Sequence, residues 1–296
     1  RHPDQPSVAQ GAANVSLGGH ALAFAMDLHI RHGVAYERVA EIYRVVFKFP
    51  ITAGGIALAI QRVARRLFAT YDKLIEALRL ADAIFVDETG WRVLRVTTWL
   101  WVFSSKDVTV YVVDARKNHE VPLRILGEGF VGVIHHDGAR TYDSLPYFMH
   151  QTCLQHILRD LDELVETKTR GAVRWPLAVA ELLRKAIHLR NSRGVQPSGE
   201  DAKDNDRAGC IEEELDRLLL ADLTDPDNVR MKKRLIRNRD SLFAFLYLEE
   251  AEATNAEAER QVRPQVATRK NGACNRSWQG APPRHSRQRA DSRRRL

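Results

Sequence analysis

Residues 20–80 carry apolar side chains at helical spacing and predict four helices. Pro50 is expected to stop the second helix, and Thr52 is expected to cap the third. A fourth helix is predicted at about residues 71–80. The apolar faces of the first three are Leu22, Met26 and Ile30; Val39, Ile42 and Val46; and Ile56, Ile60, Val63 and Leu67. A short turn bearing Pro and Gly between two helices is compatible with a helix-turn-helix over residues 35–69, and a plain helical bundle is the alternative.

The pattern changes from helices to strands at Ala83. The apolar run over residues 83–86 ends at Asp87, and Gly90 is expected to turn the chain into a three-stranded meander. The meander strands are runs rich in Val, Trp, Thr and Tyr at residues 91–96, 98–103 and 108–113. They are followed by a helix at 119–126, a strand at 131–135, a helix at 139–145, a brief strand near Gln151 and a helix at 154–166. This order predicts an α/β fold, a mixed sheet with helices on its faces.

Residues 170–250 return to helical spacing and are interpreted as an insertion into the α/β core. Three helices are predicted, with apolar positions at Leu177, Leu182, Leu183 and Ile187; Ile211, Leu215, Leu218 and Leu219; and Leu235, Leu242, Phe243 and Leu246. The polar stretch Ser192–Gly209 is expected to be an exposed loop. The whole chain is thus divided into a loose lead-in (1–19), a helical region (20–80), the first part of the core (81–166), the insertion (167–250), the completion of the core (251–281) and a basic tail (282–296).

Composition narrows the class of protein. With 296 residues, 44% hydrophobic and 28% charged, the chain is neither disordered nor fibrous. Its three cysteines, Cys153, Cys210 and Cys274, are odd in number and far apart, which suits a reducing cytoplasm rather than a disulfide framework. No apolar run approaches the roughly 18 residues of a membrane span, and no signal peptide opens the chain. We therefore expect a soluble cytoplasmic protein, and the first residue, Arg1, indicates a fragment or a processed product.

Two aspartates stand where α/β sheets present side chains to ligands. Asp87 and Asp137 each follow a predicted apolar strand, and two carboxylates on adjacent strand ends can hold a hard divalent ion such as Mg²⁺. An Asp after a strand is singly more often a turn or cap residue. Thr254 and Glu257 match a capping box, which leaves Glu259 as the freer carboxylate near the helix start. Pro264 is expected to limit or kink that helix, and a solvated helix face is the alternative for Glu259.

A cysteine and a histidine, Cys153 and His156, form C-x-x-H at the start of a predicted helix, with Arg159 one turn further. Zinc would need about four protein ligands, and no second Cys/His pair of suitable spacing exists, so we expect the pair to pack or hydrogen-bond beside the carboxylates. His135 and His136 are interpreted as core or rim residues. No phosphate-binding Gly-rich loop, nucleophile elbow or H-E-x-x-H motif is present.

Taken together, the ordered motifs resemble the insertion sequence 66 family of bacterial transposases. The matching segments are Asp87-Glu88-Thr89-Gly90-Trp91-Arg92-Val93, Trp99-Leu100-Trp101-Val102-Phe103, Asp137-Gly138 with Tyr142, Cys153-x-x-His156-x-x-Arg159-Asp160-x-x-Glu163-Leu164, and Thr254-Asn255 leading to Ala258-Glu259-Arg260 and Arg263-Pro264. The resemblance extends over residues 20–281. Each motif is weak by itself, whereas the ordered set is highly specific.

The resemblance implies a DDE transposase with a ribonuclease H-like core. It assigns the catalytic, metal-binding acids to Asp87, Asp137 and Glu259, with two Mg²⁺ or Mn²⁺ ions as cofactors. It also places Cys153 and His156 near the site and favours the helix-turn-helix interpretation. The implied reaction is hydrolysis at the transposon ends, followed by transfer of the freed 3′-hydroxyl into target DNA. Candidate phosphate contacts, for which a solvated face is an equal alternative, are Arg260, Arg263, Arg269 and Lys270.

The implied partners are the terminal inverted repeats and the target DNA, bound by a homo-oligomer in the bacterial cytoplasm and its nucleoid. A DNA-binding remnant that cannot complete transposition is the alternative function, and a structure-specific nuclease on the same scaffold is a third. Ala256 stands where the family usually has a second Asn. Composition breaks after Ala281, which predicts a truncated or frameshifted end, and sequencing the encoding locus tests this by finding or not finding the family's C-terminus in another frame.

The net charge of the chain is weak evidence for a nucleic-acid partner. The formal charge is +7, but residues 282–296 contribute +5 and residues 254–281 contribute +3, which leaves −1 for residues 1–253. Most of the chain is electrically balanced, so the case for a nucleic-acid partner depends on the acids and the motifs around them.

Overall fold

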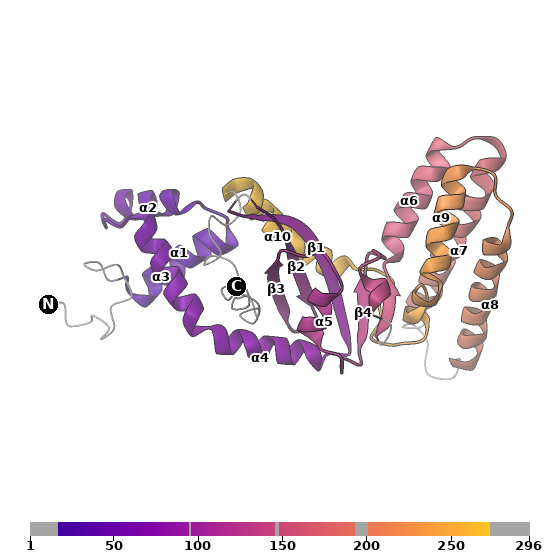
Figure 1. Ribbon diagram of the computed structural model, residues 1–296, viewed down its shortest axis with the longest axis horizontal. Coiled ribbons are helices and arrows are strands. Elements are labelled where there is room, and N and C mark those ends of the chain that lie inside the picture. Colours follow the sequence, from indigo (N-terminus) through magenta and orange to yellow (C-terminus); the bar gives the residue numbers. More distant parts are fainter. Residues whose placement is uncertain (1–16, 95, 146–147, 193–200, 273–296) are drawn as a thin grey trace, which may run out of the picture.

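The computed structural model describes residues 17–94, 96–145, 148–192 and 201–272. N-terminal helices lie at one end of the molecule, a five-stranded sheet lies in the middle, and a group of long helices lies at the other end (Figure 1). Cys274, most of the expected lead-in and the basic tail at 282–296 lie outside the described residues. Across the part of the chain that is described, no helix combines the length and the hydropathy that a membrane span requires.

Four helices precede the sheet, as the sequence predicts. They are α1 (Gly19–Met26), continued by a π-helical turn at Asp27–Arg31, then α2 (Tyr36–Val45), α3 (Ala53–Arg66) and α4 (Phe68–Arg79). The first three share a small core that includes Leu22, Val39, Tyr43, Ile56 and Ile60. The predicted cap of α3 is confirmed, because the Thr52 side chain accepts a 3.0 Å hydrogen bond from the Gly55 N–H.

The second helix ends earlier than predicted. It stops at Val45 rather than at Pro50, and Lys48 adopts a left-handed φ of 52° that a helix does not allow. Val46, expected on the apolar face, is therefore 63% exposed, and Tyr43 fills the core instead. Residues 46–52 connect α2 to α3, a longer link than the three- or four-residue turn of most helix-turn-helix motifs.

The predicted mixed sheet is confirmed. Its order is β3-β2-β1-β4-β5, with antiparallel pairs among β1, β2 and β3 and parallel pairs from β1 to β4 and from β4 to β5, consistent with a ribonuclease H-like core. The strands are β1 (Ala83–Val93), β2 (Val96–Ser104), β3 (Thr109–Asp114), β4 (Val133–His136) and β5 (Met149–Thr152). The predicted turn at Gly90 is wrong: Gly90 pairs with Trp99 inside one long ladder, and the chain turns at Leu94, whose φ is 52°.

Helices cover both faces of the sheet. On one face α4 and α5 (Glu120–Leu126) pack on Ile84, Val86 and Trp101. Along the other face runs α10 (Ala256–Gly272), which Figure 1 shows reaching from the N-terminal helices across the sheet. Of the two outcomes expected at Pro264, a limit to the helix or a kink, the limit is wrong: α10 continues for eight residues beyond it.

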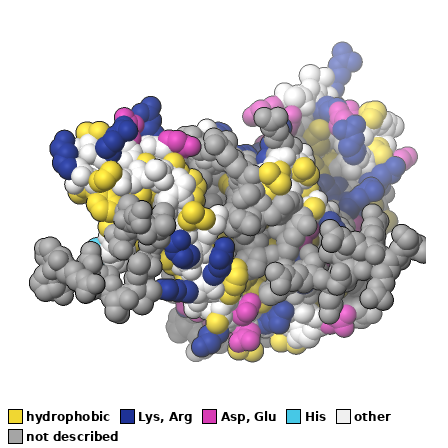
Figure 2. Space-filling model, turned by 60° about the vertical axis from the view of Figure 1, so that its left-hand side comes forward, with side chains coloured by type: hydrophobic (Ala, Val, Ile, Leu, Met, Phe, Trp, Pro, Cys, Tyr) yellow, Lys and Arg dark blue, Asp and Glu magenta, His cyan; other side chains and the backbone are white. Residues whose placement is uncertain are grey.

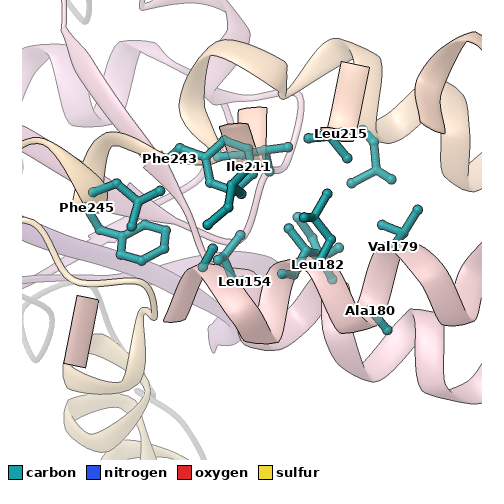
Figure 3. Close-up of a cluster of buried hydrophobic side chains, with 14 of the residues drawn as sticks. Leu154, Val179, Ala180, Leu182, Ile211, Leu215, Phe243 and Phe245 are labelled. Carbon is teal, nitrogen blue, oxygen red and sulfur yellow. The ribbon is translucent and has the colours of Figure 1, made fainter. Parts of the chain in front are cut away.

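The predicted helical insertion follows β5. The predicted core helix at 154–166 is α6 (Leu154–Thr167), and the predicted insertion contains α7 (Arg174–Ser192), α8 (Asp201–Leu220) and α9 (Pro226–Arg237). Figure 3 shows its core, where Leu182 of α7, Ile211 and Leu215 of α8 and Phe243 face one another beside Leu154.

Three sequence expectations in this half of the chain need correction. Residues 201–209, expected in a loop, begin α8, because Ala208 continues the buried face of that helix. Leu242, Phe243 and Leu246 do not extend the helix of Leu235, because α9 ends at Arg237 and is followed by two 3-10 turns, Arg239–Ser241 and Ala244–Leu246. The helix expected at 139–145 is a single 3-10 turn, Tyr142–Ser144.

Candidate active site

The two aspartates lie at the same level of the sheet. Parallel pairing of β1 with β4 ends at Phe85 and His135, so Asp87 and Asp137 each lie two residues beyond the last pair. Asp137 follows the end of β4, as predicted. Asp87 does not end a strand, because β1 continues to Val93 against β2 alone. It is the neighbouring strand that stops, and this opens the edge of the sheet beside Asp87.

The Asp87 side chain points to the face of the sheet that α10 covers. Side chains alternate along a strand, and Val86 lies in the core under α4 and α5, so Asp87 points to the opposite face. On β4, His135 stacks on Phe85 at 4.2 Å on that same opposite face, and Asp137 is two residues further. Glu259 is in the first turn of α10, the helix that lies along this face.

The charges of Asp137 and Glu259 both act on Asp87. Burial, and to a smaller extent repulsion from the carboxylates of Glu88, Asp137 and Glu259, raises the pKa of Asp87 to about 7, against a hydrogen bond from the Glu88 N–H that lowers it. Asp87 is thus close enough to both sequence-predicted partners to feel their charges. Among the described residues, the ligand atoms that lie within 4.8 Å of one another are those of Cys153, His156 and Glu259 rather than those of the three acids.

The donor set fits a divalent metal ion. Asp87 Oδ1 accepts the Glu88 N–H at 2.8 Å, and Asp137 Oδ1 accepts the Ala139 N–H at 2.8 Å. Among the described residues the second oxygen of each aspartate has no hydrogen bond. Carboxylate oxygens suit Mg²⁺ or Mn²⁺, and a dication would stabilise the charged form of Asp87, which burial and the neighbouring carboxylates disfavour.

The C-x-x-H pair lies against the glutamate. His156 Nε2 is 3.5 Å from Glu259 Oε1, and one ligand atom each from Cys153, His156 and Glu259 lie within 4.8 Å of one another. Interaction with the Cys153 thiol, and more weakly with Glu259, raises the pKa of His156. Arg159 is mostly exposed, and its ion pair is with Asp160.

The four candidate basic residues of α10 have different environments. Arg263 and Lys270 are exposed. Arg260 is also exposed, but it pairs with Glu257 at 2.7 Å. Gln261 donates to the other oxygen of Glu257. The Glu257 carboxylate is therefore directed along its own helix rather than back into a capping box. Arg269 is turned inward to β1, where it donates to Thr89 Oγ1 at 3.2 Å and to the Gly90 carbonyl.

A second polar group, on the other face of β1, has no counterpart in the sequence predictions. Glu88, only 2% exposed, pairs with Lys117 at 2.7 Å and accepts a hydrogen bond from the Tyr142 hydroxyl at 3.2 Å. Burial raises the pKa of Glu88, while Lys117 opposes that rise. Lys117 also lies over the Trp99 ring. Alternation along a strand was the available signal, because the residue after Asp87 must face the opposite layer.

The loop that carries Asp137 is fixed by helix α9. Arg237 donates to the Gly138 carbonyl at 2.6 Å, and Arg234 donates to the Asp137 carbonyl at 3.4 Å. Gly138 itself has a φ of +78°, and a Cβ there would lie 3.0 Å from Thr152. The sequence shows neither arginine as a site residue, since almost 100 positions separate them from this loop.

A mixed sheet in this strand order, with Asp87 and Asp137 just beyond its paired parallel strands, is consistent with a ribonuclease H-like core. The comparison with known families matches residues 14–282 to the family described as Transposase IS66 family. The chain belongs to this family of DDE transposases, which confirms the resemblance seen in the sequence and implies DNA transposition with a divalent metal. The comparison with curated proteins found no match.

Proposed function

We propose that the protein hydrolyses phosphodiester bonds at transposon ends and transfers the freed 3′-hydroxyl into target DNA. Asp87, Asp137 and Glu259 are the proposed metal-binding acids. The observation that supports this most is the position of Asp87 and Asp137, each two residues beyond the last β1–β4 pair, with the charges of Asp137 and Glu259 both acting on Asp87. Family membership supplies the reaction class.

Two Mg²⁺ or Mn²⁺ ions bound by these acids would activate the attacking oxygen and stabilise the leaving oxygen at phosphorus. The protein's own contribution is position. Backbone N–H groups hold one oxygen of Asp87 and one of Asp137 at 2.8 Å. His156 lies 3.5 Å from Glu259 and limits the directions its carboxylate can take. Carboxylates that are already held in place reduce the entropy lost when the reactive complex forms.

DNA contacts are proposed on two surfaces. Helices α2 and α3 form the proposed helix-turn-helix-like region for the terminal inverted repeats, and the exposed Arg263 and Lys270 of α10 lie on the helix that carries Glu259. Arg260 and Arg269 are weaker candidates because both already have protein partners. We propose that the active complex is a homo-oligomer on DNA, located at the nucleoid of a bacterial cytoplasm.

The test is a cleavage and strand-transfer assay on terminal inverted-repeat DNA with Mg²⁺. Asp87→Asn and Glu259→Gln should each lower both reactions by about a thousandfold or more, because each removes a proposed metal ligand. Glu257→Gln, on the same first turn of α10, is the matched control and should retain activity. Cleavage that survives in the first two variants contradicts the proposal, and specific DNA binding without cleavage by the unaltered protein favours the remnant.

A further inference from the structure

One buried asparagine joins the elements that carry the proposed acids. Asn255 is 1% exposed and immediately precedes α10. Its side-chain Nδ2 donates to the Val86 carbonyl at 2.8 Å. Its backbone N–H donates to Cys153 Sγ at 3.2 Å, and its carbonyl accepts the Glu259 N–H at 3.2 Å. Three separate segments therefore meet at this residue.

The Asn255 side chain bonds to Val86 just beyond the last residue of β1 that pairs with β4, while Val86 still pairs with Phe103 of β2. Parallel pairing of β1 with β4 ends at Phe85, so the Val86 carbonyl lies just beyond the paired stretch. That carbonyl belongs to the peptide unit that leads into Asp87. By holding this peptide, the Asn255 side chain fixes the start of α10 directly against the backbone of the first acid.

The bonds to Cys153 and Glu259 extend the same connection. The Cys153 thiol is at the start of α6, where the Leu154 N–H also donates to the Ala253 carbonyl at 2.9 Å. The Asn255 carbonyl closes the first turn of α10 on Glu259. A shift of Asn255 would consequently move Glu259 away from Asp87 and from the C-x-x-H segment together.

Stability alone does not account for an asparagine here. Within the described residues its Oδ1 is buried and has no hydrogen bond, which is a cost to folding that an apolar side chain would avoid. We propose that Asn255 is a positioning residue that sets the spacing between Asp87 and Glu259, and thereby the affinity of the site for divalent cations. This inference rests on the proposed function, in which those two residues are metal ligands.

The experiment measures Mn²⁺ affinity by calorimetry on the full chain without DNA, together with the free energy of unfolding. Asn255→Leu should weaken Mn²⁺ binding about 10- to 100-fold, the usual effect of removing a partner that orients metal ligands. Asn228→Leu is the control, because Asn228 is equally buried, donates through Nδ2 to the Ala172 carbonyl at 2.8 Å and also has an unpaired Oδ1. Its substitution should leave Mn²⁺ affinity within about twofold.

Unchanged Mn²⁺ affinity in folded Asn255→Leu would overturn the proposal. Asn255→Ser takes its place if the leucine variant does not fold, and it should weaken binding in the same way because a serine side chain is too short to reach Val86. The Glu259→Gln variant distinguishes failure of the positioning role from failure of the proposed function. If Glu259→Gln weakens binding and the Asn255 variant does not, the positioning role fails while the proposed function stands; if Asp87→Asn and Glu259→Gln both leave affinity unchanged, the proposed function fails.

Discussion

The surroundings of Asp87 disfavour the charged form of its carboxylate. The side chain is largely buried on β1, and the carboxylates of Glu88, Asp137 and Glu259 repel it, so its pKa rises to about 7. A raised acid pKa means that the folded protein holds the proton more tightly than the unfolded chain. The charge then destabilises the fold as pH rises above the unfolded value, and the full cost is present above pH 7.

Asp87→Asn should therefore stabilise the metal-free protein at pH 8 by about 2–4 kcal/mol, and the gain should vanish below about pH 4. Chemical denaturation at the two pH values measures it. Asp107→Asn, at an exposed turn position, is the control and should change stability by less than about 0.5 kcal/mol. Equal stability of Asp87→Asn and the unaltered protein at pH 8 would show that Asp87 is not forced into a buried acidic cluster.

The loop that carries Asp137 requires a glycine at position 138. Gly138→Ala should lower stability by about 1–3 kcal/mol, because its φ is +78° and the added Cβ would meet Thr152 at 3.0 Å. It should also reduce cleavage, since Gly138 adjoins Asp137. Gly129→Ala is the comparison, as a Cβ there meets nothing within 4 Å. Thermal unfolding of the two variants side by side decides the point, and equal melting temperatures would contradict it.

Residue patterns located the candidate acids, but they did not predict the surroundings of those acids. The strand-end positions and the motifs singled out Asp87, Asp137 and Glu259. The groups that hold their backbones, such as Arg237 at the Asp137 loop and Asn255 at the Val86 carbonyl before Asp87, come from distant parts of the chain, and hydrophobic periodicity contains no information about such contacts. The exception is Glu88, for which strand alternation alone predicts a position on the face opposite Asp87.

At the scale of elements, the insertion is connected to the site rather than merely appended to the sheet. Helix α9 reaches the Asp137 loop through Arg234 and Arg237. The cleavage rate should thus depend on a helix that lies outside the sheet.

Arg237→Ala should lower the single-turnover cleavage rate about tenfold while DNA affinity stays the same, because the loop at Gly138 loses its 2.6 Å bond. Arg230→Ala is the control on the same helix, where an exposed arginine pairs only with Asp227 among the described residues. An equal effect of the two substitutions would contradict a specific role for Arg237.

Element boundaries were predicted well where one physical signal dominated and poorly where two competed. Thr52 caps α3 as expected because its hydroxyl has a local partner. The turn expected at Gly90 is wrong, since a glycine inside a strand is locally indistinguishable from one that ends it; pairing with Trp99 decides the outcome. Likewise, Pro264 is tolerated within α10.

At the scale of the whole molecule, charge does not identify the DNA-binding surface. Acidic and basic side chains both appear on the face shown in Figure 2. Binding must then depend on local groups, and the last turn of α3 offers two exposed arginines, Arg65 and Arg66.

Replacing Arg65 and Arg66 with alanine should weaken binding to terminal-repeat DNA and reduce the slope of log affinity against log salt by about one for each phosphate that the protein no longer neutralises. The paired control is Arg184→Ala with Lys185→Ala on α7, whose partners are Asp162 and Glu214. Fluorescence anisotropy at several salt concentrations measures both pairs. The same weakening in both would contradict a DNA contact through α3.

The proposed metal site is tested most directly by locating bound Mn²⁺ with anomalous X-ray scattering from a crystal of the protein. We predict a peak coordinated by Asp87 and Asp137, with Glu259 contributing to the same centre, because the two aspartates lie just beyond the β1–β4 pairs and the charge of Glu259 acts on Asp87. A peak held by Cys153, His156 and Glu259, without either aspartate, would contradict it, since those three ligand atoms already lie within 4.8 Å of one another.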